Sequence, residues 1–301
     1  MNVVIWLQSS NIRLLFYSIN VLNKLCGDVR LLGFTGAHEP PSQMKNKNYP
    51  LDFIPKNALA TVDFDLLIVS GENASLVDVL KEAPSLGIDP DKIILDRTIA
   101  VPNFTLEKYQ RLRHSRLSIL SQNCWGGFVY HWFCLQFLSP TIDLFFPDNE
   151  FLKILRDPQT YLGKKLYFIR MNINEITKQQ YPSFLLGGVE VVMLHYTDPD
   201  CVNTAKRKWD ERLLRLNWDN LLVMMYFDDR RLLDEFDQLP FAKKVGIVPF
   251  ETDVPSGFHI NFGDTPPNDR WQICFDITNR KYWQYDLWDM LLDGKKTPLE
   301  N

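Results

Sequence analysis

The order of apolar runs at the start of the chain limits the folds that are open to it. Four runs, each of a length typical of a β-strand, occupy residues 3–7, 29–34, 64–69 and 92–95. Amphipathic segments that reach Leu25 and Leu86 lie between them. Strands that alternate with helices favour a parallel sheet with helical crossovers. We therefore predict that residues 1–113 form one α/β module.

The loop after the first predicted strand lacks the glycines of a dinucleotide-binding site. In a Rossmann fold, G-x-G-x-x-G lets the backbone approach the pyrophosphate closely. Here Gln8-Ser9-Ser10-Asn11 follows the strand, and Ser10 or Asn11 is suited to cap a helix. Glu39 is a weak substitute for the acid that should follow the second strand. We interpret the module as a Rossmann-like scaffold that lacks the glycine-rich loop.

The composition is that of a globular protein and excludes several other classes. Hydrophobic residues make up 46% and charged residues 23% of the chain, far from the values of disordered proteins. A formal net charge of -4 provides no overall attraction for nucleic acid. The five cysteines include no CxxC pair, which favours reduced thiols over a disulfide scaffold or a four-ligand zinc site.

The sequence contains neither a secretory signal pattern nor an apolar run long enough to cross a bilayer. Residues 1–26 are apolar, but they are interrupted by Arg13 and have no basic first segment. The longest apolar run elsewhere, residues 128–138, is much shorter than the roughly 20 residues of a spanning helix. We expect a cytoplasmic protein without a transmembrane segment, and the sequence leaves its oligomeric state open.

The remaining residues, 114–301, predict a second α/β module with a mainly parallel sheet. A short apolar strand at 117–120 runs into a polar loop with two glycines and then into an apolar helix. A strand, a glycine turn and a helix leave backbone N–H groups that can face an anion. The residues expected to bind the anionic group of a substrate are Asn123, Trp125, Gly126 and Gly127.

Two further strands of this module are predicted at 189–194 and 221–227, with an amphipathic helix between them. Such a βαβ unit forms a parallel pair in nearly all known cases. His195 and Asp228, which follow the two strands, would then lie at one carboxyl edge, where open α/β sheets bind ligands. A parallel strand before Asn123 would add its loop to the same edge.

Three side chains near these strand ends are candidates for proton transfer or nucleophilic chemistry. Cys124 and His131 could form a thiol–imidazole pair for acyl transfer. A buried structural thiol and a core histidine are the commoner alternatives for these two residue types. His195, at the end of a strand, is the better candidate for an acid or base.

Charged side chains could bind a substrate at the same edge. Asp228 with Asp229 could hold a divalent ion that carries a nucleotide-sugar diphosphate, but adjacent acids after a strand are also ordinary turn residues. We assign no metal ligands and leave the cofactor unknown. Arg212 could clamp a phosphate or carboxylate, or pair with Glu211, Asp210 or Asp219. Asp219 is itself a second candidate for a substrate-binding carboxylate.

Several short motifs of the second module together resemble one bacterial family. They are SQNCWGGFVYH at 121–131, LQFxSPT at 135–141, His195-Tyr196, KWxxR at 208–212 and NWDN at 217–220. In this combination they resemble the domain-of-unknown-function family that is often labelled exopolysaccharide biosynthesis protein. The resemblance extends from about Leu117 to Pro249. It implies an α/β fold and a link to surface-polysaccharide gene clusters, and it implies no particular reaction.

The strand ends and the resemblance lead to one main hypothesis. The protein would be a transferase or related enzyme that acts on a sugar or nucleotide-sugar during cell-surface polysaccharide biosynthesis. In this hypothesis the Asn123 loop holds an anionic group, His195 moves a proton, and Asp228 or Asp219 supplies a carboxylate.

Two alternatives remain open at this point. The first is a non-catalytic carbohydrate- or nucleotide-binding scaffold protein, which the glycine-free first loop favours. The second is cysteine-dependent acyl transfer through Cys124. Aromatic residues between Trp271 and Trp288 would suit a sugar platform, although such a cluster usually packs as a cover over the core.

Overall fold

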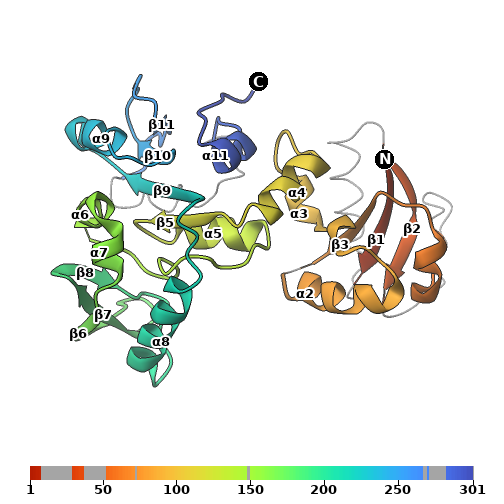
Figure 1. Cartoon of the computed structure of the whole chain (residues 1–301), viewed down its shortest axis with the longest axis horizontal. Coiled ribbons are helices and arrows are strands. Elements are labelled where there is room, and N and C mark those ends of the chain that lie inside the picture. Colours follow the sequence, from red (N-terminus) through yellow and green to blue (C-terminus); the bar gives the residue numbers. More distant parts are fainter. Residues whose placement is uncertain are drawn as a thin grey trace. The chain divides into compact units, whose positions relative to one another are not determined.

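The computed structural model describes residues 1–7, 29–36, 52–71, 73–147, 150–266, 270 and 283–300. Contacts divide the chain into two compact units (Figure 1). The first consists of Met1–Gln110 with His131–Cys134, and the second of Arg111–Tyr130 with Leu135–Asn301. Within the described ranges, every helix is too short or too polar to span a bilayer.

The first unit is built on a parallel four-stranded sheet. Its strands lie in the order β2 (Arg30–Gly36), β1 (Asn2–Leu7), β3 (Leu66–Ser70) and β4 (Ile93–Leu95). Helix α2 (Asn73–Glu82) contacts β3 and β4. The strands β1, β3 and β4 are buried on both faces, which explains why their sequences are continuous apolar runs. The predicted parallel α/β sheet is therefore confirmed.

The strand order bears on the Rossmann-like prediction. Rossmann sheets have the order 3-2-1-4-5-6, whereas β1 lies here between β2 and β3. A Rossmann-like arrangement is therefore not established. The loop from Gln8 to Asn11, the helix predicted up to Leu25, and Glu39 lie outside the described residues.

The second unit contains a parallel sheet, called sheet B below. Its strands lie in the order β11 (Gly257–His259), β10 (Lys243–Val248), β9 (Leu221–Tyr226) and β5 (Ser118–Ser121). Helices α9 (Arg230–Asp237) and α11 (Leu287–Asp293) contact β10 (Figure 1). The strand at 117–120, whose direction the sequence left open, pairs in parallel with the strand at 221–227.

A second sheet in this unit, sheet C, is antiparallel. Its strands are β6 (Leu166–Ile173), β7 (Gln180–Leu186) and β8 (Val189–Val192). Gly187 and Gly188 both have positive φ, 60° and 91°, as a two-residue hairpin turn requires. This turn places β8 antiparallel to β7. The predicted βαβ unit is therefore wrong: α8 (Cys201–Leu213) connects strands of two different sheets.

One short segment joins the two sheets. Phe145 and Val192 exchange two backbone hydrogen bonds of 2.9 Å, so the segment lies beside β8. The next residue, Phe146, donates its N–H to the carbonyl oxygen of Gln122 at 2.8 Å, directly after β5. The end of β8 is thereby connected to the carboxyl end of β5 through residues 145–146. Through this connection the end of β8 lies close to the Asn123 loop.

Candidate functional site

The carboxyl edge of sheet B is defined here by the residues that follow β5 and β9. Because these strands are adjacent and parallel, Asn123 and Asp228 emerge at the same edge, which is the outcome expected if the strand before Asn123 is parallel. Gln122 links the two strands, since its N–H donates to Met224 and its side-chain oxygen accepts from the N–H of Tyr226, both at 3.0 Å. Asp228 is exposed and forms no hydrogen bond or ion pair within the described part of the chain.

The neighbouring Asp229 has a structural task instead. Its Oδ1 accepts the backbone N–H of Arg231 at 2.9 Å and so caps α9. The Arg231 guanidinium lies 2.8 Å from Oδ2, and this hydrogen bond holds the pKa of Asp229 below its usual value. Within the described ranges, no group of three His, Cys, Asp or Glu side chains could hold a metal ion. The pair of acids considered for a divalent ion is thus reduced to Asp228.

The Asn123 loop uses its polar groups to start helix α5 (Trp125–Trp132). The Asn123 side-chain oxygen accepts the N–H of Trp125 at 3.0 Å, and Ser121 Oγ accepts the N–H of Gly126 at 3.1 Å. These are the first amides of the helix, which the prediction assigned to an anion. The anion-binding role stays a prediction, and a ligand would have to displace these caps.

The two glycines of this loop differ in their surroundings. A Cβ atom on Gly126 would lie 2.8 Å from Ser121 Oγ and 3.0 Å from Cγ2 of Ile119, so a side chain would clash. A Cβ on Gly127 would meet its nearest neighbour, Ile142, at 3.5 Å, which is an ordinary contact. Trp125 is fully buried against Trp283. Gly126 therefore allows α5 to pack closely on β5.

Arg212, on α8, is buried in a cluster with Cys124, Asp143 and Tyr196, called the Arg212 cluster below. Its Nη1 donates to the Ile142 carbonyl at 3.2 Å and to the Tyr196 hydroxyl at 3.0 Å. Its Nη2 lies 3.7 Å from Asp143 Oδ2. Only 8% of the Arg212 side chain is exposed. The guanidinium is therefore engaged inside the protein, and its ion-pair partner is Asp143 rather than one of the expected acids Glu211, Asp210 and Asp219.

Burial is the main cause of the raised pKa values of Cys124 and Tyr196 in this cluster. Cys124 Sγ donates to the Leu144 carbonyl at 3.6 Å, and desolvation, with a smaller effect of the Asp143 charge, raises the pKa of the thiol to about 12. Desolvation likewise raises the pKa of Tyr196 to about 12, although the Arg212 charge opposes it. The reactive form of a cysteine is the thiolate, so the structure does not favour Cys124 as a nucleophile near neutral pH.

Both predicted histidines are exposed, and only His131, on α5, lies in the element that the sequence patterns assigned to it. His195 is exposed in the turn after β8, and β8 belongs to sheet C, so the prediction of one sheet edge shared with Asp228 is wrong. His131 is exposed rather than buried in the core. It groups with the first unit, where its carbonyl accepts from Arg97 Nη2 at 2.6 Å, whereas Cys124 belongs to the second unit.

A cavity of about 430 Å³ opens at the opposite, amino edge of sheet B. Its walls come from the junction of α6 (Glu150–Arg156) with α7 (Pro158–Leu162) and from the segments that precede β9 and β10. Trp218 and Asp219 lie on it, and we call it the Trp218 cavity. Asp219 and Asp228 stand at opposite ends of β9, on the order of 20 Å apart. The main hypothesis named Asp228 or Asp219 as the carboxylate, and the structure places these two alternatives at opposite edges of the sheet.

Sequence reasoning missed Asp143, Tyr196 and, apart from Asp219, the walls of the Trp218 cavity. Tyr196 lies within the His195-Tyr196 motif, where only the histidine was considered as chemistry. Asp143 has a positive φ of 63°, which is rare outside glycine and is not visible in the sequence. Gln159 reaches the cavity only through the packing of α7, so no local pattern could identify it.

One comparison with known proteins, a family model, covers mainly the second unit. A family model described as "Domain of unknown function (DUF1919)" matches residues 96–285. An uncharacterized protein of Haemophilus influenzae is 32% identical over 146 residues, which is 48% of this chain. The match covers 66% of that relative, slightly less than two thirds of its length. Neither description mentions exopolysaccharide, and this part of the predicted resemblance is not confirmed.

Proposed function

The chain belongs to the DUF1919 family, and we propose that it is a transferase or related enzyme acting on a sugar or nucleotide-sugar in cell-surface polysaccharide biosynthesis. The observation that carries the proposal is Asp228. It is an exposed carboxylate that has no partner among the described residues, and it lies at the carboxyl edge of a parallel sheet, the usual ligand-binding edge of open α/β sheets. The sugar class is supported by the resemblance of the 121–131 motif to a family labelled for exopolysaccharide biosynthesis.

In the proposed reaction, Asp228 acts as the general base. It accepts the proton of an acceptor hydroxyl while the hydroxyl oxygen bonds to the anomeric carbon of the donor. The bond from that carbon to the phosphate oxygen breaks, and its electron pair leaves with the phosphate. His195 stays a prediction as the acid for the leaving group, because residues 145–146 connect the end of its strand, β8, to the carboxyl end of β5.

The second candidate function is a non-catalytic carbohydrate- or nucleotide-binding scaffold. One observation favours it: most polar groups near the carboxyl edge are engaged internally. The first amides of α5 are capped, Asp229 caps α9, and Arg212 is buried against Tyr196 and Asp143. A protein that binds without turnover needs fewer available reactive groups.

A panel of nucleotide-sugars, with and without Mg²⁺ or Mn²⁺, separates the two functions. Thermal stabilisation reports binding, and release of nucleoside diphosphate reports turnover. The proposal predicts turnover that falls roughly 10²–10⁴-fold in Asp228→Asn, because the general base is lost. The matched control is Asp234→Asn, which removes an exposed carboxylate on α9 and should keep full turnover.

Each other outcome has a defined meaning. Stabilisation without turnover would support the scaffold function and reject the transferase. Turnover that is unchanged in Asp228→Asn would reject the assigned base. Loss of turnover in His195→Gln, at unchanged melting temperature, would establish His195 as a second participant. If no nucleotide-sugar stabilised the protein or reacted, the transferase acting on a nucleotide-sugar and the nucleotide-binding form of the scaffold would both be rejected.

A further inference from the structure

We propose that the Trp218 cavity is a binding site for a neutral saccharide. The cavity lies at the amino edge of sheet B and does not include Asp228. Its volume of about 430 Å³ falls within the range of small-ligand pockets, roughly 300–1,000 Å³. The inference goes beyond the proposed function and holds even if no transfer takes place at the carboxyl edge.

An exposed aromatic ring forms one wall. Trp218 is 39% exposed, whereas the other tryptophans in the described ranges are buried or half-buried. A large apolar ring left in water carries a hydrophobic cost that a ligand can relieve. The flat C–H face of a pyranose fits such a ring, while the sugar hydroxyls remain free for polar partners. Phe241 and Pro240 extend the apolar surface.

Two polar side chains beside the ring are available for a ligand. The carboxylate of Asp219 and the amide of Gln159 are exposed and form no side-chain hydrogen bond within the described part of the chain. A carboxylate accepts and an amide both donates and accepts, which together match a pair of neighbouring sugar hydroxyls. Few convergent polar groups on an otherwise apolar wall are typical of small-ligand sites.

The charge of the walls argues for a neutral ligand. Arg156 supplies the positive charge, but its guanidinium is hydrogen-bonded to Glu235, which neutralises it. Asp157 and Asp219 then leave the cavity with net negative character. Negative walls repel phosphates and uronic acids. The cavity therefore suits a neutral sugar and disfavours the nucleotide-sugar proposed for the carboxyl edge.

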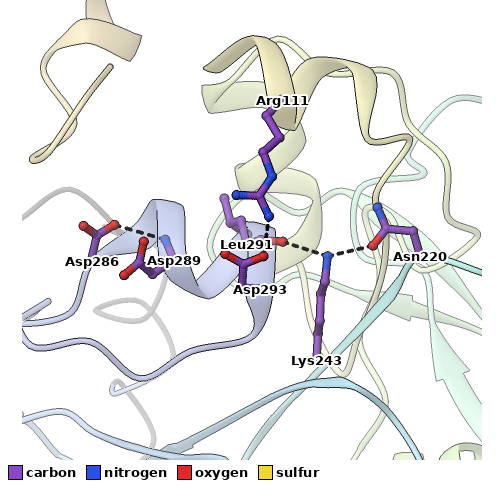
Figure 2. Close-up of polar contacts among 7 residues, drawn as sticks. All are labelled: Arg111, Asn220, Lys243, Asp286, Asp289, Leu291 and Asp293. Atoms are coloured by element: carbon purple, nitrogen blue, oxygen red, sulfur yellow. Dashed lines mark hydrogen bonds and ion pairs between the residues drawn. The ribbon is translucent and has the colours of Figure 1, made fainter. Parts of the chain in front are cut away.

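A hydrogen-bonded network behind the cavity holds the two strand starts in place (Figure 2). Lys243, next to cavity residue Ala242, donates to the Asn220 side-chain oxygen at 2.7 Å and to the Leu291 carbonyl at 3.4 Å. Asn220, next to Asp219, donates in turn to the Ser115 carbonyl at 2.8 Å. These contacts tie the starts of β9 and β10 to the end of α11.

A carboxylate offsets part of the positive charge in this network. Figure 2 shows Arg111, on α4 (Leu106–His114), paired with Asp293 beside Lys243. Burial lowers the pKa of Lys243, and the nearby Asp293 carboxylate counteracts that effect. The cavity is thus built on a fixed backbone, which reduces the ordering that a ligand would have to impose.

The test uses the full chain and a panel of sugars titrated by tryptophan fluorescence and saturation-transfer NMR. The neutral probes are glucose, galactose, N-acetylglucosamine and their β-linked disaccharides, and the anionic probes are glucuronic and galacturonic acid. We expect a neutral probe to saturate the wild-type protein and the matching uronic acid to bind at least roughly tenfold more weakly. Binding of the uronic acid with equal or higher affinity would overturn the charge argument.

Variants locate the site. Trp218→Ala and Asp219→Asn should each lower the affinity for the neutral probe at least roughly tenfold and leave the melting temperature unchanged. The matched control is Tyr167→Ala, which removes an exposed aromatic ring of sheet C and should leave affinity unchanged. Asp228→Asn should also leave it unchanged, so failure of the proposed function can be recognised separately. The inference is overturned if no neutral probe saturates the protein, or if Trp218→Ala binds as the wild type does.

Discussion

The two edges of sheet B use their polar side chains in different ways. The carboxyl edge holds or adjoins most residue types that carry chemistry, including Cys124, Arg212 and two aspartates, yet many of them are engaged in caps and buried pairs. The amino edge has fewer reactive types, but Trp218, Asp219 and Gln159 face an open cavity. The comparison shows that the availability of a side chain, more than its type, indicates where a ligand can bind.

The strongest test of this comparison is to disrupt the engaged groups. Arg212→Ala would leave the buried Tyr196 hydroxyl and Ile142 carbonyl without their donor, so we expect a loss of about 3 kcal/mol in the free energy of unfolding. The measurement is urea unfolding followed by circular dichroism. A wild-type value for Arg212→Ala would mean that the guanidinium is available for a ligand after all.

Asp143→Asn serves as the control for that variant. The Asp143 side chain is 43% exposed and its oxygen lies 3.7 Å from Arg212, so the ion pair is weak and screened by solvent. We expect a loss of about 1 kcal/mol or less.

The glycines of the Asn123 loop distinguish packing from anion binding. Gly126→Ala inserts a Cβ atom 2.8 Å from Ser121 Oγ and should destabilise the protein by about 1–3 kcal/mol through overpacking. Gly127→Ala has space and sits in a helix, so it should be neutral or stabilise by up to about 1 kcal/mol. Thermal unfolding of the two variants checks this. Equal effects would argue against the packing role of Gly126.

The Cys124 thiol provides a pH-dependent test. Its pKa is raised to about 12 in the folded protein, so the folded state holds the proton more tightly than the unfolded chain does. This stabilisation is complete below pH 9 and is lost as the pH rises toward 12. Stability should therefore fall more steeply above pH 9 in the wild type than in Cys124→Ala.

Alkylation gives a second measure of the same property. Iodoacetamide should label the half-buried Cys134 before Cys124 at pH 8, as peptide mass spectrometry can follow. Faster labelling of Cys124 would restore the acyl-transfer hypothesis.

The smallest expected effect concerns the network behind the Trp218 cavity. Lys243→Met keeps the aliphatic chain and removes the bonds to Asn220 and Leu291. We expect the free energy of unfolding to fall by roughly 1 kcal/mol. We also expect the affinity for the neutral saccharide to fall several-fold, because the starts of β9 and β10 are held less firmly. Calorimetric titration beside a melting curve measures both. Unchanged saccharide affinity would show that the cavity does not depend on this network.

Sequence patterns predicted the parallel sheets well because buried parallel strands are continuous apolar runs. Asn123 and Asp228 each follow such a strand after a short loop, so parallel pairing of the two strands brings both residues to one edge. The pattern failed for β8, since an apolar strand looks alike in parallel and antiparallel sheets. The pairing is decided by the two-glycine turn at 187–188, which makes β8 antiparallel to β7. Partners brought together by tertiary packing, such as Arg212 with Asp143, have no local sequence signal.

The central claim is that the two edges of sheet B carry two independent sites. A crossed titration tests it most directly: a neutral saccharide and a reactive nucleotide-sugar are each measured against Trp218→Ala and Asp228→Asn. We predict that Trp218→Ala loses only saccharide affinity and that Asp228→Asn loses only nucleotide-sugar turnover. A single variant that abolished both, or a saccharide that competed with the nucleotide-sugar, would contradict the account.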